Sequence, residues 1–208
     1  NKYIDTMILE WDLANSIGLS SPGCNEDKRE AGGDEELRPR LTTAFRRSAA
    51  MANYMAQDRP DISFASKEVS RGMSCPTRLD TVKLKRMIRY LSNARRRAIK
   101  YTWQDPTDQL TVFSDSDWAG CVKTRRSTSG GDLLHGRHLV HHWSSTQATV
   151  ALSSAEAELT PLLKALRKVL AQRACLKSAP QSVAVAFLLT VLQPTVLFTV
   201  RAAERSSI

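Results

Sequence analysis

Four carboxylates in two short motifs are the residues best placed to do chemistry in this chain. Asp115 and Asp117 follow an apolar run at residues 110–113, and Glu156 and Glu158 lie where a helical pattern begins. An acid at the end of a strand and an acid early in a helix can share a divalent cation, and hard oxygen ligands suit Mg²⁺ or Mn²⁺. A pair of such ions can drive phosphodiester hydrolysis, but holding both ions takes more than two carboxylates.

The spacing within each pair predicts which acids can meet. Asp115 and Asp117 share one face of an extended strand, whereas Glu156 and Glu158 point to nearly opposite sides of a helix. Ser153 and Glu156 match a capping box, which gives Glu156 a structural role. We therefore predict Asp115 and Glu158 as the catalytic acids and metal ligands, with Asp117 either an outer ligand or a turn residue.

The composition favours an anionic partner. The chain of 208 residues carries a formal charge of +9, which is typical of nucleic-acid binding, although a basic surface that only aids solubility is the alternative. The four cysteines lie far apart without CxxC spacing: Cys24, Cys75, Cys121 and Cys175. This pattern predicts free thiols and an intracellular location, cytoplasmic or nuclear. Neither apolar run near the C-terminus reaches the roughly 20 residues of a membrane span.

Helical periodicity precedes the acidic motifs. Apolar residues recur at helical spacing over residues 41–57, a second helix begins near Pro60, and a third covers residues 78–93. The outer face of the third helix and the residues after it are basic: Lys83, Lys85, Arg86, Arg89, Arg95, Arg96 and Arg97. A run of positively charged side chains indicates either a contact to a phosphate backbone or a solvated face.

A two-residue period follows. It predicts strands over residues 99–103, 109–115, 130–135 and 138–143, and then a helix from near Ser153. The apolar tail over residues 178–208 is interpreted as buried strands or as a degenerate segment. Four histidines lie within this stretch, namely His135, His138, His141 and His142. We interpret them as polar strand positions, because alternation separates His141 from His138 and His142 and disfavours a metal site.

Four motifs in order resemble the ribonuclease H domain of copia-type LTR retrotransposon Pol polyproteins. They are FSDSDWAG at 113–120, RSTSG at 126–130, WSSTQ at 143–147 and ALSSAEAE at 151–158. Residues 52–62 and 84–91 are similar to the helical end of the reverse transcriptase and its connection. The resemblance implies a mixed sheet flanked by helices that cuts RNA in RNA–DNA hybrids with two Mg²⁺ ions. In its pattern Asp115 matches the first metal ligand and Glu158 the second.

The chain also departs from that pattern. Val200 stands where the resemblance implies a third metal-binding Asp, and no Asp follows Asp132. Pro161 falls inside the carboxylate helix, where it removes the hydrogen bond to the Ala157 carbonyl. The chain begins with Asn1 rather than Met, so we expect a fragment. Pro161 and the missing third Asp predict that its activity is impaired. The alternative is a catalytically inactive remnant that binds nucleic acid.

These observations predict an α/β chain with a ribonuclease H-like mixed sheet and flanking helices, preceded by a small helical segment and incomplete at the C-terminus. We expect a poorly ordered segment or linker over 1–40, a helical reverse-transcriptase end over 41–97, a partial ribonuclease H-like domain over 98–177, and a degenerate apolar tail over 178–208. The expected partners are an RNA–DNA hybrid and other parts of a Pol polyprotein. The residues expected to hold the nucleic-acid backbone are Arg125, Arg126, Lys85, Arg89, Arg95, Arg96 and Arg97.

Overall fold

The computed structural model describes residues 2–23, 35–107, 109–175, 182–187 and 196–201. The chain divides into two compact units, Asn1–Ile99 and Lys100–Ile208. Each unit has a hydrophobic core of its own, and each is described separately below. None of the helices in these described ranges combines the length and the apolar character that a membrane span requires.

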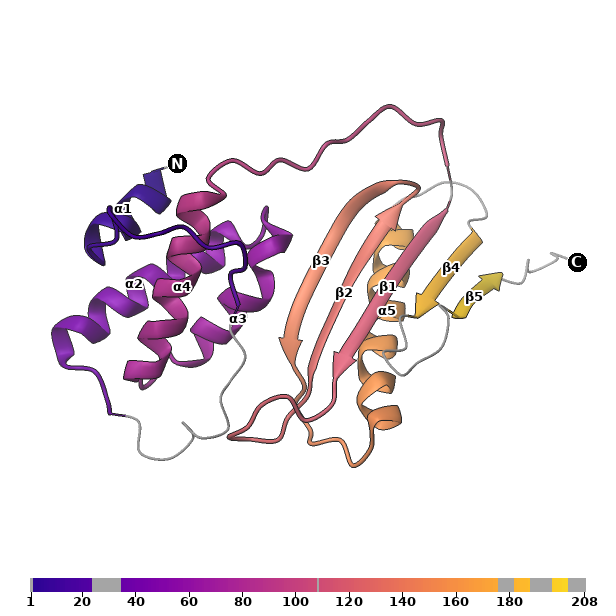
Figure 1. Ribbon diagram of the computed structural model, residues 1–208. Coiled ribbons are helices and arrows are strands. Elements are labelled where there is room, and N and C mark those ends of the chain that lie inside the picture. The colour runs from indigo at the N-terminus through magenta and orange to yellow at the C-terminus, as the bar shows by residue number, and fades with distance from the viewer. Residues whose placement is uncertain (1, 24–34, 108, 176–181, 188–195, 202–208) are drawn as a thin grey trace, which may run out of the picture. The chain divides into compact units, whose positions relative to one another are not determined.

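Unit 1 is a bundle of helices (Figure 1). Its elements are α1 (Lys2–Glu10), α2 (Pro39–Met55), the short 3-10 helix η2 (Pro60–Ile62), α3 (Ser63–Arg71) and α4 (Arg78–Asn93). Every helix turns an apolar stripe inward, and Phe45 of α2 and Leu84 of α4 are fully buried in the shared core. A capping box between Thr77 and Asp80 begins α4, so this helix starts where the sequence predicts it.

The N-terminal helix α1 is part of the core of unit 1. Ile4, Met7, Ile8 and Trp11 have the spacing of one helical face and are all buried. The indole nitrogen of Trp11 donates a hydrogen bond to the Ser48 hydroxyl over 2.9 Å. The expectation of a poorly ordered segment over 1–40 is therefore wrong for α1, while residues 24–34 lie outside the described part of the chain.

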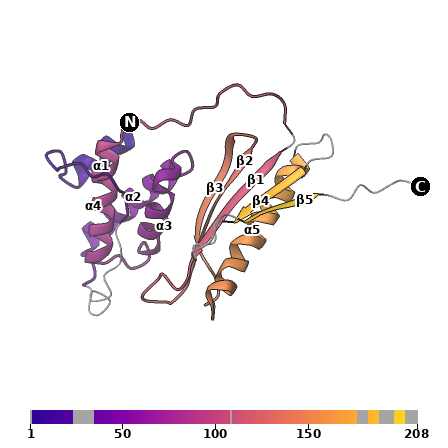
Figure 2. The ribbon, with the colours of Figure 1, turned by 45° about the vertical axis from the view of Figure 1, so that its right-hand side comes forward.

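Unit 2 is a sheet covered on one face by a long helix, so the predicted mixed α/β class is confirmed (Figures 1 and 2). The strands are β1 (Leu110–Asp117), β2 (Thr128–His135), β3 (His138–Thr146), β4 (Ser182–Phe187) and β5 (Val196–Arg201), and the helix is α5 (Ser154–Cys175). The spatial order is β3-β2-β1-β4-β5. β1, β2 and β3 pair antiparallel, β4 is parallel to β1, and β5 is antiparallel to β4.

The core of unit 2 fixes which face of the sheet α5 covers. Leu110 and Val112 of β1 are fully buried and pack with Ala165 and Val169 of α5. Leu133 of β2 and Trp143 of β3 complete this cluster. Because side chains alternate along a strand, the even-numbered residues of β1 face the helix.

One sequence-based expectation about this unit is corrected, and one alternative for the tail is supported. Residues 99–103 form no strand; side chains hold this segment instead, for example the Tyr101 hydroxyl, which donates to the Leu139 carbonyl over 2.8 Å. Next to it, the side-chain amide of Gln104 donates to the His135 carbonyl over 3.1 Å. Strands and a degenerate segment were both expected for the apolar tail over 178–208, and the structure has strands there, β4 and β5, while residues 178–181, 188–195 and 202–208 lie outside the described ranges.

Candidate functional site

The two acidic motifs meet at one edge of the sheet. β3 runs in the same direction as β1, and α5 begins after β3, so the end of β1 and the start of α5 lie at the same edge (Figure 1). This places Asp115 and Glu158 on neighbouring elements. The strand-then-helix arrangement that the spacing predicts is therefore present.

The two predicted ligands nevertheless extend from different sides of β1. Val112 and Ser114 are buried toward α5, whereas Phe113, Asp115 and Asp117 are exposed. Asp115 thus lies on the face opposite α5, and the partly buried Glu158 lies on α5 itself. Within the described ranges no three His, Cys, Asp or Glu side chains lie close enough together to hold a metal ion. A shared Mg²⁺ or Mn²⁺ on Asp115 and Glu158 stays a prediction, and the described residues do not fit a two-ion site.

Asp117 has a structural role in the turn after β1. Its carboxylate accepts a hydrogen bond from the backbone N–H of Thr128. Gly120 lies directly against this carboxylate, and a Cβ added at Gly120 would overlap it. Of the two roles that the sequence leaves open for Asp117, the structure supports the turn residue.

The loop between β1 and β2 is held by specific hydrogen bonds. The Trp118 indole donates to the Ala151 carbonyl over 3.1 Å. Ser127 is fully buried, and its hydroxyl accepts from the Ala119 N–H over 3.0 Å. These contacts fix a loop that carries Arg125 and Arg126, both exposed, at the edge of the sheet where β1 ends.

Glu156 caps α5. Its N–H donates to the Ser153 hydroxyl over 3.2 Å, and its carboxylate accepts from the Leu152 N–H over 2.7 Å. The predicted capping role is confirmed, although the carboxylate takes the amide of Leu152 rather than that of Ser153. Glu156 is therefore engaged at the helix start.

α5 continues through Pro161, and a side chain from β3 supplies the hydrogen bond that Pro161 cannot. Proline has no N–H, so the Ala157 carbonyl has no helical donor. The Gln147 amide nitrogen donates to that carbonyl over 2.6 Å and to the Ser129 hydroxyl over 2.9 Å. Gln147 is 4% exposed, so it links the first turns of α5 to β2 in a buried setting. No sequence pattern predicted this contact.

Basic side chains of α4 form hydrogen bonds to the backbone of the segment that follows α1. The Arg89 guanidinium donates to the Ile17 carbonyl over 2.8 Å, and that of Arg86 donates to the Gly23 carbonyl over 2.5 Å. The exposed Lys85 lies with its ammonium nitrogen 5.8 Å from the centroid of the Trp11 ring. Arg89, predicted as a nucleic-acid contact, thus has an intramolecular partner.

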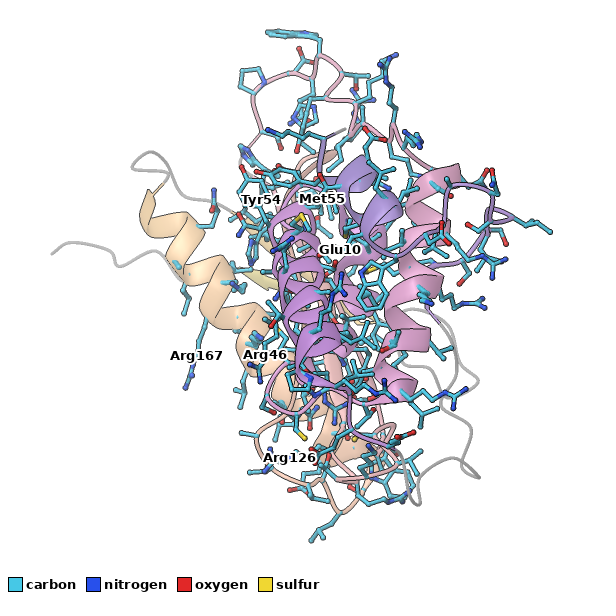
Figure 3. All side chains as sticks on the ribbon, turned by 90° about the vertical axis from the view of Figure 1, so that its left-hand side faces the viewer. Glu10, Arg46, Tyr54, Met55, Arg126 and Arg167 are labelled. Carbon is cyan, nitrogen blue, oxygen red and sulfur yellow. The ribbon has the colours of Figure 1, made fainter. Side chains whose placement is uncertain are left out.

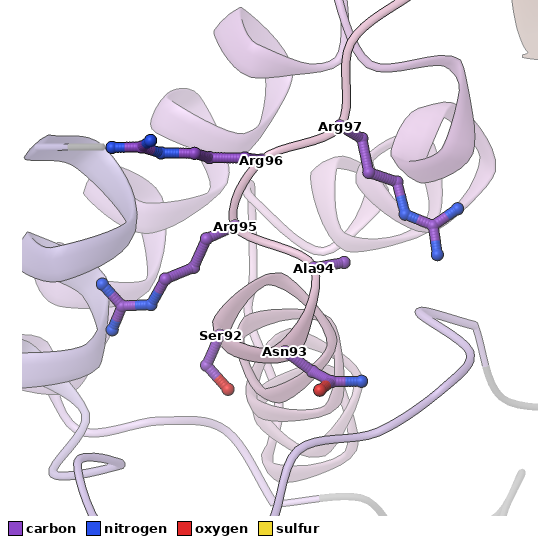
Figure 4. Close-up of a pocket in the computed structure, with 6 residues that line it drawn as sticks. All are labelled: Ser92, Asn93, Ala94, Arg95, Arg96 and Arg97. Carbon is purple, nitrogen blue, oxygen red and sulfur yellow. The ribbon is translucent and has the colours of Figure 1, made fainter.

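The three arginines after α4 line a surface pocket of about 530 Å³ together with Ser92, Asn93 and Ala94 (Figure 4). Arg95 forms an ion pair with Asp5 at 2.5 Å, and the Arg97 guanidinium lies 5.7 Å from the centroid of the Tyr90 ring. Figure 4 shows Arg95 and Arg96 directed to one side and Arg97 to the other. The three groups do not converge on a single point.

A partly buried ion pair that the sequence did not predict lies within unit 1. Arg59, 9% exposed, forms two hydrogen bonds to the Asp61 carboxylate, over 2.7 and 2.8 Å. The Tyr90 hydroxyl donates to the same carboxylate over 2.6 Å. Burial would raise the pKa of Asp61, but the hydrogen bonds from Arg59 and Tyr90 outweigh it and lower the pKa. Burial and the Asp61 carboxylate both raise the pKa of Tyr90. This network explains why Arg59 and Asp61 flank Pro60.

Comparison with known proteins places the chain in a family. It is 36% identical over 157 residues to the retrovirus-related Pol polyprotein from transposon RE1 of Arabidopsis thaliana, covering 76% of this chain and 10% of that protein. It is 36% identical over 118 residues to the uncharacterized mitochondrial protein AtMg00810 of the same plant, covering 57% of this chain and 49% of that protein. It is 38% identical over 121 residues to secreted RxLR effector protein 161 of Plasmopara viticola, covering 57% of this chain and 83% of that protein.

The chain thus spans about half the length of one of these relatives and a tenth of the Pol polyprotein. No family model and no solved structure matches it. The matches to transposon Pol polyproteins agree with the four motifs of unit 2 and the helical motifs of unit 1. The chain belongs to the family of copia-type LTR retrotransposon Pol polyproteins, of which it represents a fragment.

Proposed function

We propose that unit 2 is a ribonuclease H-like domain that binds the backbone of RNA–DNA hybrids and has impaired Mg²⁺-dependent hydrolysis. One observation carries the proposal: the exposed Asp115 and the fixed loop with Arg125 and Arg126 lie together at the edge where α5 begins. The mixed sheet, with β4 parallel to β1 and α5 over one face, supports the fold that the resemblance implies. Unit 1 is then the end of the reverse transcriptase and its connection.

The net positive charge of the chain and the loop between β1 and β2 both support binding of a phosphate backbone. The chain carries a net charge of +9, and the exposed Arg125 and Arg126 extend from a loop whose backbone is held by Trp118 and Ser127. Arginine matches the geometry of phosphate oxygens and keeps its charge at any physiological pH. Other segments of the same polyprotein and nucleic acid are the proposed partners, in an intracellular setting, cytoplasmic or nuclear.

Hydrolysis is impaired because too few acids converge. Two-ion catalysis needs more than two carboxylates. The carboxylates of Asp117 and Glu156 are engaged by backbone N–H groups. Val200, where the resemblance implies an Asp, pairs with Val183 between β5 and β4. Asp115 and Glu158, the proposed ligands for Mg²⁺ or Mn²⁺, lie on opposite sides of β1. The same observation favours the second candidate function, a nucleic-acid-binding remnant without catalysis.

Equilibrium binding tests the proposal. A fluorescently labelled RNA–DNA hybrid is titrated with the whole chain at several salt concentrations, with and without Mg²⁺. Backbone binding predicts a linear fall of log K with log salt, about 0.9 per neutralised phosphate. The double substitution Arg125→Gln with Arg126→Gln should lower that slope by about 2 if each arginine contacts a phosphate. Absence of salt-dependent binding, or an unchanged slope in the double variant, would contradict the proposed interface.

A further inference from the structure

Three basic side chains gather where β3 faces α5. Lys164 and Lys168 are one helical turn apart on α5, and His141 extends from β3. The Lys168 ammonium nitrogen lies 5.9 Å from the centroid of the Trp143 ring, and the His141 ring stacks on Trp143 with centroids 6.0 Å apart. The Lys164 ammonium donates to the Ser145 hydroxyl over 2.6 Å. The cluster therefore surrounds two neighbouring side chains of the edge strand β3.

No acid balances this cluster in the described part of the chain. None of the ion pairs there involves His141, Lys164 or Lys168. The neighbouring acid, Asp132, pairs in register with His142 and so lies on the other face of the sheet. The charges of Lys164 and Lys168 repel each other without a compensating ion pair, as like charges one turn apart on a helix do.

The same groups are partly removed from water. Burial lowers the pKa of His141, and the charges of Lys168, His142 and Lys164 lower it further. Burial and then the charge of Lys168 lower the pKa of Lys164. The Nε2 atom of His141 is buried and has no hydrogen-bond partner within the described residues. An anion would stabilise these partly desolvated groups. Its negative charge would offset the charges of Lys164 and Lys168, and its oxygens would accept hydrogen bonds from the ammonium groups and the His141 ring.

We propose that β3 and α5 form a phosphate-binding site in which Lys164, Lys168 and His141 hold one phosphodiester group of a nucleic-acid backbone. This inference rests on the proposed function, since it takes nucleic acid as the source of the phosphate. Trp143 is 9% exposed, so it supports the Lys168 ammonium and cannot stack on a base. The site therefore binds without regard to sequence. β2 separates β3 from β1, so the site is about 10 Å across the sheet from the strand of Asp115, and on the opposite face.

α5 also provides a matched control. Arg167 adjoins Lys168 in sequence but is exposed and extends away from the helix in Figure 3. The variants are the double substitution Lys164→Gln with Lys168→Gln, and the single substitution Arg167→Gln. Thermal unfolding of both variants is measured first. The double variant should unfold at about the temperature of the unsubstituted chain, because the removed repulsion offsets the lost Lys164–Ser145 hydrogen bond and the lost Lys168–Trp143 contact.

Binding of a labelled RNA–DNA hybrid is then measured against salt for the whole chain. The double variant should reduce the slope of log K against log salt by about 1, because one phosphate contact is lost. Arg167→Gln should change the slope by less than half of that amount. An unchanged slope in the double variant, or an equal loss in Arg167→Gln, would overturn the site.

Inorganic phosphate separates this inference from the proposed function. Imidazole signals in NMR spectra are followed as phosphate replaces chloride at constant ionic strength, with His141→Gln identifying the relevant signal. Phosphate should shift the His141 signal in the unsubstituted chain and not in the double lysine variant. Equal shifts in both, or no shift, would refute the site. A phosphate-dependent shift without hybrid binding would overturn nucleic acid as the source and the proposed function with it, while leaving an anion site.

Discussion

Replacing Gln147 tests how the chain accommodates a proline inside α5. The Gln147 amide donates to the Ala157 carbonyl over 2.6 Å, and Pro161 leaves that carbonyl without a helical donor. Gln147→Ala therefore leaves the buried Ala157 carbonyl without a hydrogen-bond donor, which lowers the free energy of unfolding by about 1–3 kcal/mol. In a Pro161→Ala background the new N–H at position 161 can bond to Ala157. The cost of Gln147→Ala should then fall by about 1 kcal/mol, the net value of one hydrogen bond.

Urea unfolding measures this coupling in a double-mutant cycle. The chain has four tryptophans, and in a Trp11→Phe background the remaining three all lie in unit 2, so their fluorescence reports on that unit. Gln172→Ala removes an amide from α5 away from this contact, and it should change the free energy of unfolding by about 0.5 kcal/mol or less. If Gln147→Ala costs the same with and without Pro161, Gln147 does not replace the missing helical donor and the reasoning fails.

Three further predictions concern stability. The pKa of Asp61 is lowered in the folded state, so its contribution to stability is present above the unfolded pKa of about 3.9 and is lost as pH falls through the folded value. Acid titration followed by circular dichroism should show this loss, and Asp61→Asn should flatten the dependence. Tyr90→Phe removes a hydrogen bond to a charged group, so urea unfolding of unit 1 should show a loss of about 1.5–3 kcal/mol and less acid sensitivity; unchanged values would argue against the network. Gly120→Ala places a methyl group against the Asp117 carboxylate, so urea unfolding of unit 2 should show a loss of about 1–3 kcal/mol in the free energy of unfolding. An unchanged free energy would show that the turn accommodates the methyl group.

The sequence predicted local structure well where one pattern dominates. Helical spacing predicted α4, the capping residues Ser153 and Glu156 predicted the start of α5, and alternation predicted that Asp115 and Asp117 share a face. The sequence did not predict which face of β1 the helix covers, because apolar Phe113 shares the face of Asp115 and polar Ser114 shares the face of Val112. We therefore expected Asp115 and Glu158 to meet, whereas Asp115 lies on the face opposite α5.

Other features depended on long-range contacts that no local pattern carries. Residues 99–103 alternate like a strand, yet side-chain bonds such as the one from Tyr101 to the Leu139 carbonyl hold them in place of a backbone ladder. The segment over 1–40 was expected to be poorly ordered, yet it includes the buried helix α1, whose partners on α2 and α4 lie far along the chain. The roles of Arg89 and Gln147 became evident only from their distant carbonyl acceptors.

Cleavage of a saturated RNA–DNA hybrid tests the central claim most directly, because it asks whether Asp115 and Glu158 form a working metal site. Single-turnover cleavage is measured in Mg²⁺ and in Mn²⁺ with the unsubstituted chain and with Asp115→Asn, at protein concentrations that bind all of the hybrid. We expect bound hybrid and slow metal-dependent cleavage, which Asp115→Asn reduces further. Rapid cleavage that Asp115→Asn abolishes would contradict this expectation, since the acids on the two sides of β1 would then have to act on one phosphate.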